Sequence, residues 1–472
     1  MCRYRETLFA AKRSYKYRQI LEVIKVVFSS LEFIFIFLPI FFILYATAPG
    51  KWKNVVIVFG SLAFYGYGAK DTPEYILYFI FTILLNFSIG KCLGFGKIRD
   101  RILIFIALVF NLVPLIWFKV NIDNIILPVG ISFFTFQNLS YVMDVKRKTV
   151  EKEDSLINYA TYISLFPQLI AGPIVTYRQV KVQLNKRRVT PRRMYHGISL
   201  FILGLGFKVL LANRIGNLWF NIESIGYQSI STPLAWMGLI AFSLQIYFDF
   251  YGYSLMAMGL GTMMGFKFPQ NFDHPYTSVT MAEFYRRWHM TLGSWFREYL
   301  YIPLGGNRKG TARTIFNLFI VWFMTGLWHG INWNFLVWGL GLWLIIVLEK
   351  CVYRKFLEKH RFIGHLYVIA IIPVMWFIFA MTDWNDFLTY LSRLFPVKGN
   401  WMGVFARDYI KYLSLYGGYF AAGLLLCTRL PEKIWNKIKN NFFGVIILLA
   451  IFAAAVYCMY LGLNDPFLYF RF

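Results

Sequence analysis

Long apolar runs recur along most of the chain and are separated by short polar segments. They predict membrane-spanning helices near residues 31–48, 53–68, 74–90, 101–119, 124–143, 195–213, 234–264, 315–333, 334–349, 366–382, 410–428 and 441–462. A run of about 20 apolar residues is long enough to cross the hydrocarbon core of a bilayer. The runs are continuous and not alternating, which indicates helices and not the strands of a membrane barrel.

Two further stretches are apolar or aromatic but are not predicted to be simple membrane spans. The stretch 156–177 contains Pro167, Gly172 and Pro173, which break helices. We therefore expect a re-entrant segment that enters and leaves on one side and is covered by other protein or by a water cavity. The polar stretch 267–313 alternates aromatic and charged residues at helical spacing, which is typical of helices at the membrane interface. The pattern as a whole predicts an all-α polytopic membrane protein with about 11–12 transmembrane helices.

The composition supports a place in the membrane. Hydrophobic residues make up 58% of the chain and charged residues 15%, whereas soluble domains average about 45–50% apolar residues. The net charge is +26. We interpret this excess as cationic loops that stay on the cytoplasmic side and face anionic membrane lipid, and we expect no nucleic-acid binding.

The basic loops also predict the topology. Lys and Arg cluster at 91–101, 146–148, 178–193, 286–313, 354–361 and 429–439. With twelve spans and one re-entrant segment, all six clusters fall on one side of the membrane, which the positive-inside rule identifies as the cytoplasm. Residues 1–26 are also basic but would lie outside, and they lack the apolar core of a signal peptide. We expect 1–26 to be a poorly ordered N-terminal extension and 27–472 to form a single membrane domain.

Few residues are suited to chemistry. The five cysteines lie far apart without a CxxC pair, so neither a metal site nor a disulfide framework is indicated. His329 is the strongest candidate because it ends the apolar run TIFNLFIVWFMTGLWHG, with Asn332 just beyond. An imidazole titrates near neutral pH and can act as a general base. The residues alone are equally compatible with a structural histidine that is hydrogen-bonded between helices.

Other candidates surround a second histidine and one carboxylate. His289 follows Arg286, Arg287 and Trp288, and by itself it reads as a solvated histidine at the interface. The group Arg286, Arg287, Arg297 and Arg308, with Trp288 between them, would suit a phosphate-bearing donor that approaches from the cytoplasm. Asp249 lies within an apolar run, where a carboxylate faces a cavity or a partner. It can contact substrate or join two helices, and the sequence does not decide between these roles.

Five stretches together resemble the membrane-bound O-acyltransferase (MBOAT) family, in the branch that is similar to alginate O-acetyltransferases. They are PVGISFFTFQNLSYVMDV, YISLFPQLIAGPIVTY, LQIYFDFYGYS, the central run from Gly265 to Arg308, and GLWHG. The resemblance covers the chain from about Phe28 onward. It implies the MBOAT fold, with re-entrant and interfacial helices and a ring of membrane helices around a thin central tunnel. Two positions depart from the family pattern: Leu255 replaces an acidic residue and Leu342 a further histidine, which leaves fine substrate detail open.

The resemblance also implies a function. His329 matches the catalytic histidine of the family, and His289 matches its second histidine. The expected enzyme is an O-acetyltransferase of the bacterial inner (cytoplasmic) membrane. It takes acetyl from a cytoplasmic thioester, expected to be acetyl-CoA, and passes it outward for O-acetylation of an exopolysaccharide such as alginate, with an SGNH-type partner enzyme outside. Two alternatives remain: D-alanyl transfer to teichoic acid from a carrier-protein thioester, and a non-catalytic transporter of polysaccharide or lipid.

Overall fold

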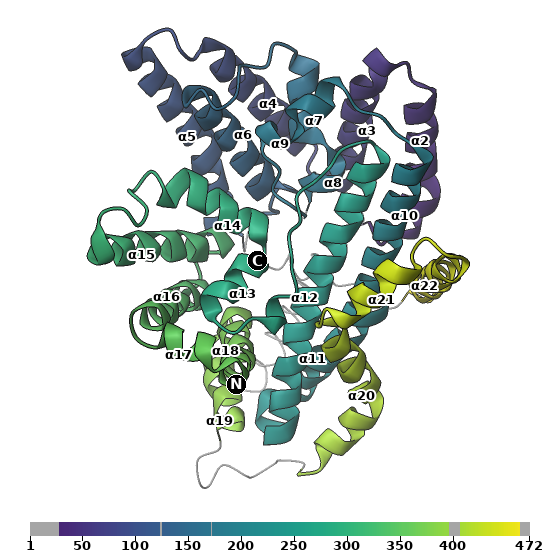
Figure 1. Cartoon of the computed structure of the whole chain (residues 1–472), viewed down its shortest axis with the longest axis vertical. Coiled ribbons are helices and arrows are strands. Elements are labelled where there is room, and N and C mark those ends of the chain that lie inside the picture. The colour runs from purple at the N-terminus through teal and green to yellow at the C-terminus, as the bar shows by residue number, and fades with distance from the viewer. Residues whose placement is uncertain (1–27, 123–124, 171, 396–405, 463–472) are drawn as a thin grey trace, which may run out of the picture. The chain divides into compact units, whose positions relative to one another are not determined.

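The computed structural model describes residues 28–122, 125–170, 172–395 and 406–462 (Figure 1). Every regular element in these ranges is a helix. The predicted extension 1–26 lies outside the described residues. The chain divides into an N-terminal unit, up to Ile170 together with Thr176–Arg188, and a C-terminal unit, mainly Val189–Cys458 with Ala171–Val175. A single membrane domain over 27–472 remains a prediction.

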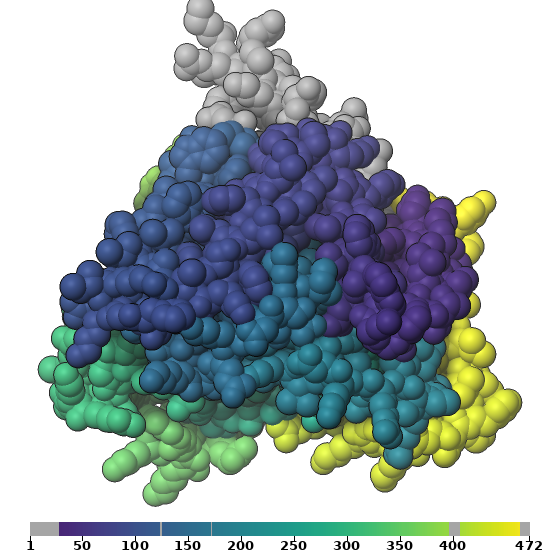
Figure 2. Space-filling view, turned by 90° about the horizontal axis from the view of Figure 1, so that it is seen from above, coloured from purple at the N-terminus to yellow at the C-terminus, as the bar shows by residue number. Residues whose placement is uncertain are grey.

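The N-terminal unit consists of apolar helices joined by short connections. In both views α2 (purple) and α5 (blue) lie at opposite edges of this unit (Figures 1 and 2). Its elements are η1 (Phe33–Phe37), α2 (Leu38–Thr47), η2 (Gly50–Trp52), α3 (Lys53–Gly68), α4 (Glu74–Cys92), α5 (Lys97–Val120), α6 (Ile131–Lys146), α7 (Leu156–Ser164), α8 (Phe166–Leu169) and α9 (Tyr177–Asn185).

The C-terminal unit is built around one long buried helix, α12, which packs along α10 and α11 (Figure 1). Its elements are α10 (Pro191–Gly206), η3 (Phe207–Ala212), α11 (Asn213–Ile225), η4 (Tyr227–Ser229), α12 (Thr232–Met263), η5 (Pro275–Thr277), α13 (Met281–Arg287), α14 (Met290–Phe296), η6 (Arg297–Tyr301), α15 (Gly310–His329), α16 (Trp333–Leu348), η7 (Glu349–Tyr353), α17 (Arg354–Lys359), α18 (Arg361–Ala380), α19 (Trp384–Leu394), α20 (Asp408–Leu426), α21 (Leu430–Ile438) and α22 (Phe442–Tyr460).

The outer helices expose the apolar faces that lipid would cover. Along α5, Ile98, Phe105 and Ile116 are all more than half exposed, a pattern that a soluble monomer avoids. Among the described residues seven helices are long and apolar enough to cross a membrane, or eight if the bent pair α20 and α21 counts as one span. The prediction of an all-α, multi-pass membrane protein is confirmed.

The number of such helices is smaller than the 11–12 expected from the apolar runs. Some predicted spans are too short or too polar to be counted. Helices α3 and α6 have only 16 residues each. Helix α15 has 20 residues but carries more polar positions. The predicted span 124–143 in fact begins at Ile131. Pro128 and Gly130 precede it, and Gly130 adopts a left-handed conformation with φ of 72° that stops a helix from extending further back.

The expected re-entrant stretch is broken as its prolines indicate. Helix α7 ends at Ser164, α8 occupies only Phe166–Leu169, and residues 173–176 form no helix before α9 begins. Tyr159–Ile170 is buried throughout, as irregular backbone at membrane depth requires. Whether this stretch enters and leaves the membrane on one side remains a prediction.

Glycines allow α10 and α12 to approach very closely. A Cβ atom added to Gly252 would lie 2.6 Å from the carbonyl oxygen of Gly204, and one added to Gly204 would lie 2.4 Å from the carbonyl oxygen of Gly252. Small residues at such contacts are typical of packed membrane helices, whose association depends on close van der Waals contact.

A bulky residue at this contact should therefore destabilise the protein. We expect Gly252→Val to cost about 1–3 kcal/mol or more, as overpacking does elsewhere, because backbone and not a flexible side chain blocks the new atoms. Thermal unfolding in detergent, followed by tryptophan fluorescence, measures the effect. The matched control is Gly418→Val in α20, where an added Cβ meets nothing within 4 Å. Equal midpoints for the two variants would contradict the close packing of α10 on α12.

Candidate active site

A cavity of about 130 Å³ lies inside the C-terminal unit. Aromatic rings form most of its wall, and His289, His329 and Asp249 are among the few polar side chains on it. Its lining comes from α12 (Ile246, Asp249, Phe250), α13 and the turn after it (Tyr285, Trp288, His289), α14 (Leu292, Gly293, Phe296), α15 (Val321, Trp322, Thr325, His329), α16 (Trp338) and α18 (Trp376, Phe379).

His329 is the last residue of α15 and is only partly buried. Its ring lies edge-on to Trp338 and Phe379, with ring centroids 5.2 Å and 5.0 Å away. The aromatic walls hold the imidazole in one orientation. The ring therefore stands at the C-terminal end of α15 and forms part of the cavity wall.

His289 occupies the turn between α13 and α14. It is 4% exposed, so the interpretation of a solvated interfacial histidine is wrong. Its ring lies edge-on to Phe250, with centroids 4.7 Å apart, and burial lowers the pKa of His289 to about 3. The side chain is therefore neutral at physiological pH. The sequence suggested solvent exposure because Arg286 and Arg287 precede His289. In the structure Arg286 is exposed, whereas His289, after the turn at Trp288, is buried.

The backbone of His289 is strained. Its φ is 44°, a left-handed conformation that costs a residue other than glycine on the order of 1–3 kcal/mol. Asn271 holds this turn, because its carbonyl oxygen accepts a hydrogen bond from the Met290 N–H at 2.9 Å and its side-chain oxygen lies 3.0 Å from Nδ1 of His289. Strained residues that are held in this way cluster at functional sites.

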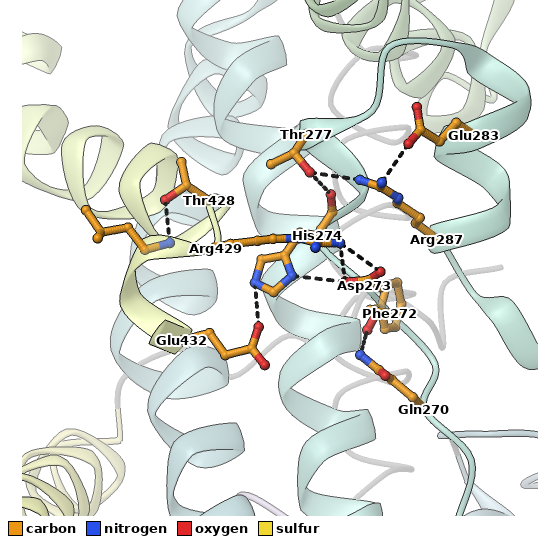
Figure 3. Close-up of polar contacts among 11 residues, drawn as sticks. Gln270, Phe272, Asp273, His274, Thr277, Glu283, Arg287, Thr428, Arg429 and Glu432 are labelled. Atoms are coloured by element: carbon orange, nitrogen blue, oxygen red, sulfur yellow. Dashed lines mark hydrogen bonds and ion pairs between the residues drawn. The ribbon is translucent and has the colours of Figure 1, made fainter. Parts of the chain in front are cut away.

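The loop that carries Asn271 is held by polar contacts with Arg429, just before α21, and with Glu432 in α21 (Figure 3). Arg429 donates to both carboxylate oxygens of Asp273, at 3.2 Å and 3.1 Å. His274 is buried and lies between two carboxylates, with Nδ1 3.3 Å from Asp273 and Nε2 3.4 Å from Glu432. His274 therefore connects two elements and is not among the residues that line the cavity.

Asp249 forms a buried ion pair behind the cavity wall. Its carboxylate lies 2.8 Å from Nζ of Lys208, and the same Nζ donates to the side-chain oxygen of Asn213 at 2.9 Å. Lys208 is 0% exposed and Asp249 2%. The pair joins α12 to η3. Asp249 also lines the cavity, where contact with substrate remains a prediction.

The structure brings together only some of the predicted site residues. His329, His289, Trp288 and Asp249 all line the cavity. Arg286, Arg297 and Arg308 are exposed and do not line it. Arg287 bonds with Glu283 at 2.6 Å and with Thr277 at 3.0 Å (Figure 3), and Asn332 is exposed at the start of α16.

Sequence reasoning did not identify the aromatic wall or Asn271. Trp338, Trp376 and Phe379 look like ordinary residues of apolar spans, and only the packing of α16 against α18 shows that they form part of a cavity wall. Asn271 lies in the polar run FPQNFDHPY. Its many turn-forming residues were the signal in the sequence that could have drawn attention to this loop. Within the described ranges no group of three or more His, Cys, Asp or Glu side chains is close enough to hold a metal ion.

The arrangement can perform proton transfer in a narrow, mostly aromatic space. One imidazole, His329, is of a chemical type that can take up a proton near neutral pH. A second imidazole, His289, is kept neutral. Most of the wall is aromatic, and a site that excludes water strengthens polar interactions inside it.

Comparisons with known proteins agree with such chemistry. The family model described as MBOAT, membrane-bound O-acyltransferase family, matches residues 131–392, a range that includes the whole cavity. The probable alginate O-acetylase AlgI of Pseudomonas aeruginosa is 37% identical over 345 residues, which cover 68% of this chain and 65% of that protein. The chain thus matches slightly less than two thirds of the length of that relative.

Two further relatives are named for other acceptors, peptidoglycan and teichoic acid. The peptidoglycan O-acetyltransferase of Helicobacter pylori is 31% identical over 458 residues, 84% of each chain. The teichoic acid D-alanyltransferase of Bacillus subtilis is 28% identical over 256 residues, 51% of this chain and 63% of that protein.

Proposed function

The chain belongs to the membrane-bound O-acyltransferase family, and on that premise we propose that it is an O-acetyltransferase that transfers acetyl from a thioester to a hydroxyl group. The observation that carries the proposal is the pairing of His329 with a small, aromatic-walled cavity. His329 would act as the general base. The cavity would hold the acetyl group and shield the thioester from water.

The size of the cavity favours transfer of a short acyl group. A cavity of 150 Å³ in another protein binds benzene, so the 130 Å³ here suits about six non-hydrogen atoms. An acetyl thioester carbonyl fits such a space, whereas the nucleotide of a coenzyme A donor does not and would remain outside. The exposed Arg286, Arg297 and Arg308 are available to meet its phosphates.

The chemical step follows from these positions. Nε2 or Nδ1 of His329 removes the proton of the acceptor hydroxyl while its oxygen attacks the thioester carbonyl carbon. The carbon–sulfur bond then breaks, and the departing thiolate takes the proton from the imidazolium. The ester is formed, the thiol is released and His329 returns to its neutral form, so protons and charge balance.

The acceptor is proposed from the relatives. Alginate O-acetylase and peptidoglycan O-acetyltransferase are similar to this chain over two thirds of its length or more. We infer an extracytoplasmic polysaccharide as the final acceptor, reached either directly or through the serine of an SGNH-type partner enzyme. The donor is acetyl-CoA from the cytoplasm, and the protein lies in the inner membrane. Transfer across the bilayer moves only the acetyl group, because the charged donor cannot cross.

The alternatives have less support. The D-alanyltransferase relative matches about half of the chain at a lower identity. A D-alanyl group also carries an ammonium, for which the aromatic lining offers only Asp249 as a counter-charge, and that carboxylate is already paired with Lys208. A transporter would need space for a sugar chain or a lipid, which the 130 Å³ cavity does not provide.

Acyl-chain length tests the proposal directly. Purified protein with the secreted partner enzyme and an oligosaccharide acceptor should transfer radiolabelled acetyl from acetyl-CoA. Each methylene that a tight apolar pocket cannot accept costs about 10–200-fold in rate, so octanoyl-CoA should give no detectable transfer. Equal rates with the two donors would contradict an acyl site in this cavity.

Trp338→Ala should widen the cavity and raise the rate with butyryl-CoA relative to acetyl-CoA. The control is Trp343→Ala on the same helix, because Trp343 does not line the cavity and instead donates from Nε1 to the carbonyl oxygen of Ile315 at 3.1 Å. A change in donor preference in the control and not in Trp338→Ala would place the acyl site elsewhere.

A further inference from the structure

Asn271 is the centre of a hydrogen-bond network behind the cavity. Its side-chain oxygen lies 3.0 Å from Nδ1 of His289 and 2.9 Å from Oγ1 of Thr291. Its side-chain nitrogen donates to Oγ of Ser254 at 3.1 Å and to the carbonyl oxygen of Gly172 at 3.4 Å. All the polar positions of this amide are used, and Asn271 itself is 1% exposed.

The orientation of the amide is fixed by a backbone donor. The N–H of Thr291 lies 3.4 Å from the side-chain oxygen of Asn271, and a backbone N–H can only donate. The hydroxyl of Thr291 already accepts the Ile174 N–H at 2.9 Å, so its own proton also points to Asn271. Rotating the amide would place its NH₂ group against these donors and its oxygen against the carbonyl oxygen of Gly172. The oxygen must therefore face His289.

This orientation determines the tautomer of His289. A carboxamide oxygen accepts only, so Nδ1 of His289 must carry a proton and donate it. The ring is neutral, and Nε2 then holds a lone pair. Nε2 is buried without a hydrogen-bond partner among the described residues, in a ring that forms part of the cavity wall. A buried acceptor without a partner is costly, and a hydrogen-bond donor on a bound ligand would remove that cost.

We propose that Asn271 is a positioning residue that holds His289 as an obligate hydrogen-bond acceptor for a hydroxyl or amide N–H of the substrate. The proposal rests on the proposed acyl transfer and deepens it. It separates the roles of the two imidazoles: His329 removes the proton, and Nε2 of His289 orients the group that donates to it. In this tautomer His289 has no proton at Nε2 and cannot stabilise the oxyanion by donating to it.

The tautomer of His289 can be measured without an activity assay. The chain has only six histidines, so ¹⁵N-histidine labelling gives few ring signals, and His289→Ala identifies those of His289 by their loss. We expect the proton on Nδ1 in the wild-type protein and a mixture of tautomers in Asn271→Ala. A proton on Nε2 in the wild-type protein, or an unchanged tautomer in Asn271→Ala, overturns the proposal whether or not the protein transfers acetyl groups.

A double-mutant cycle tests the positioning role. We expect Asn271→Ala to lower kcat about tenfold, the value of one net hydrogen bond, in the wild-type background and to have no further effect in the His289→Ala background. The control is Asn317→Ala in α15, another fully buried asparagine whose amide donates to the carbonyl oxygen of Gly306 at 2.8 Å. Its effect should be the same in both backgrounds. Full additivity of Asn271→Ala and His289→Ala overturns the positioning role.

Asn271→Asp covers the case in which Asn271→Ala fails to fold. It keeps the acceptor oxygen for His289 and Thr291 and adds a negative charge, which favours the imidazolium and raises the pKa of His289. Protonated Nε2 becomes a donor, so activity should be lost as the pH falls through the raised pKa and recover above it. A pH profile identical to that of the wild-type protein overturns the proposal.

Discussion

His329→Ala should abolish acetyl transfer while leaving the protein folded. A positioned general base contributes about 10²–10⁴-fold to a rate, so the residual kcat should fall by at least a hundredfold. The substitution removes a partly exposed ring at the end of α15 and leaves the helix itself intact. Transfer of radiolabelled acetyl to the acceptor measures the loss, and thermal unfolding in detergent verifies the fold.

Two comparisons distinguish loss of the base from loss of structure. His196→Ala is the control, because His196 is exposed on α10 and does not line the cavity; it should retain full activity. Added imidazole should partly restore the activity of His329→Ala, since the space left by the ring adjoins the cavity and admits a molecule of the same size. If His329→Ala kept more than roughly a tenth of the wild-type rate, the loss would be too small for a general base, and His329 would have no part in the chemistry.

The long helices could be predicted from the sequence because apolar length alone determines them. The runs 234–264 and 441–462 correspond to α12 (Thr232–Met263) and α22 (Phe442–Tyr460) within two residues at each end. The same reasoning overestimated the segment near residue 130, where Pro128 and a left-handed Gly130 delay the start of α6. Hydropathy does not register such local backbone constraints.

The site could be predicted where the unusual residue was itself the signal. An imidazole or a carboxylate in an apolar run is costly, which singles out His329 and Asp249 from the sequence alone. His289 could be associated with the site only through the family resemblance, since its neighbours in sequence are arginines. Asn271 and Trp338 could not be found in this way, because an asparagine in a polar loop and a tryptophan in a span are both ordinary. Asn271 contacts His289, which follows it by 18 residues in the chain. Trp338 contacts His329, which lies on another helix.

The buried pair of Lys208 and Asp249 raises the question of whether it serves stability or catalysis. Both side chains are almost fully buried and 2.8 Å apart. Removing one partner of a buried ion pair leaves an uncompensated charge, at a cost of about 3–5 kcal/mol. Replacing both partners by apolar residues of similar size is often neutral or stabilising. The single and the double substitution therefore have opposite expected effects on stability.

Lys208→Met should lower the stability of the C-terminal unit by about 3 kcal/mol or more, because Asp249 then remains ionised between α12 and η3 or must take up a proton. Combining it with Asp249→Leu should return the unfolding midpoint close to the wild-type value. Thermal unfolding in detergent measures both, with Lys411→Met on the exposed face of α20 as the control for loss of a lysine. A single variant as stable as the control would contradict the buried-charge argument.

The activity of the double variant then separates the two roles of Asp249. If the pair only joins the helices, Lys208→Met with Asp249→Leu should regain wild-type acetyl transfer together with wild-type stability. We expect instead that it folds but transfers acetyl at least about tenfold more slowly, since the lost carboxylate lines the cavity and one hydrogen bond to a charged group is worth about 1.5–3 kcal/mol. A stable, fully active double variant would show that Asp249 acts only through Lys208, and that the cavity does not need its carboxylate.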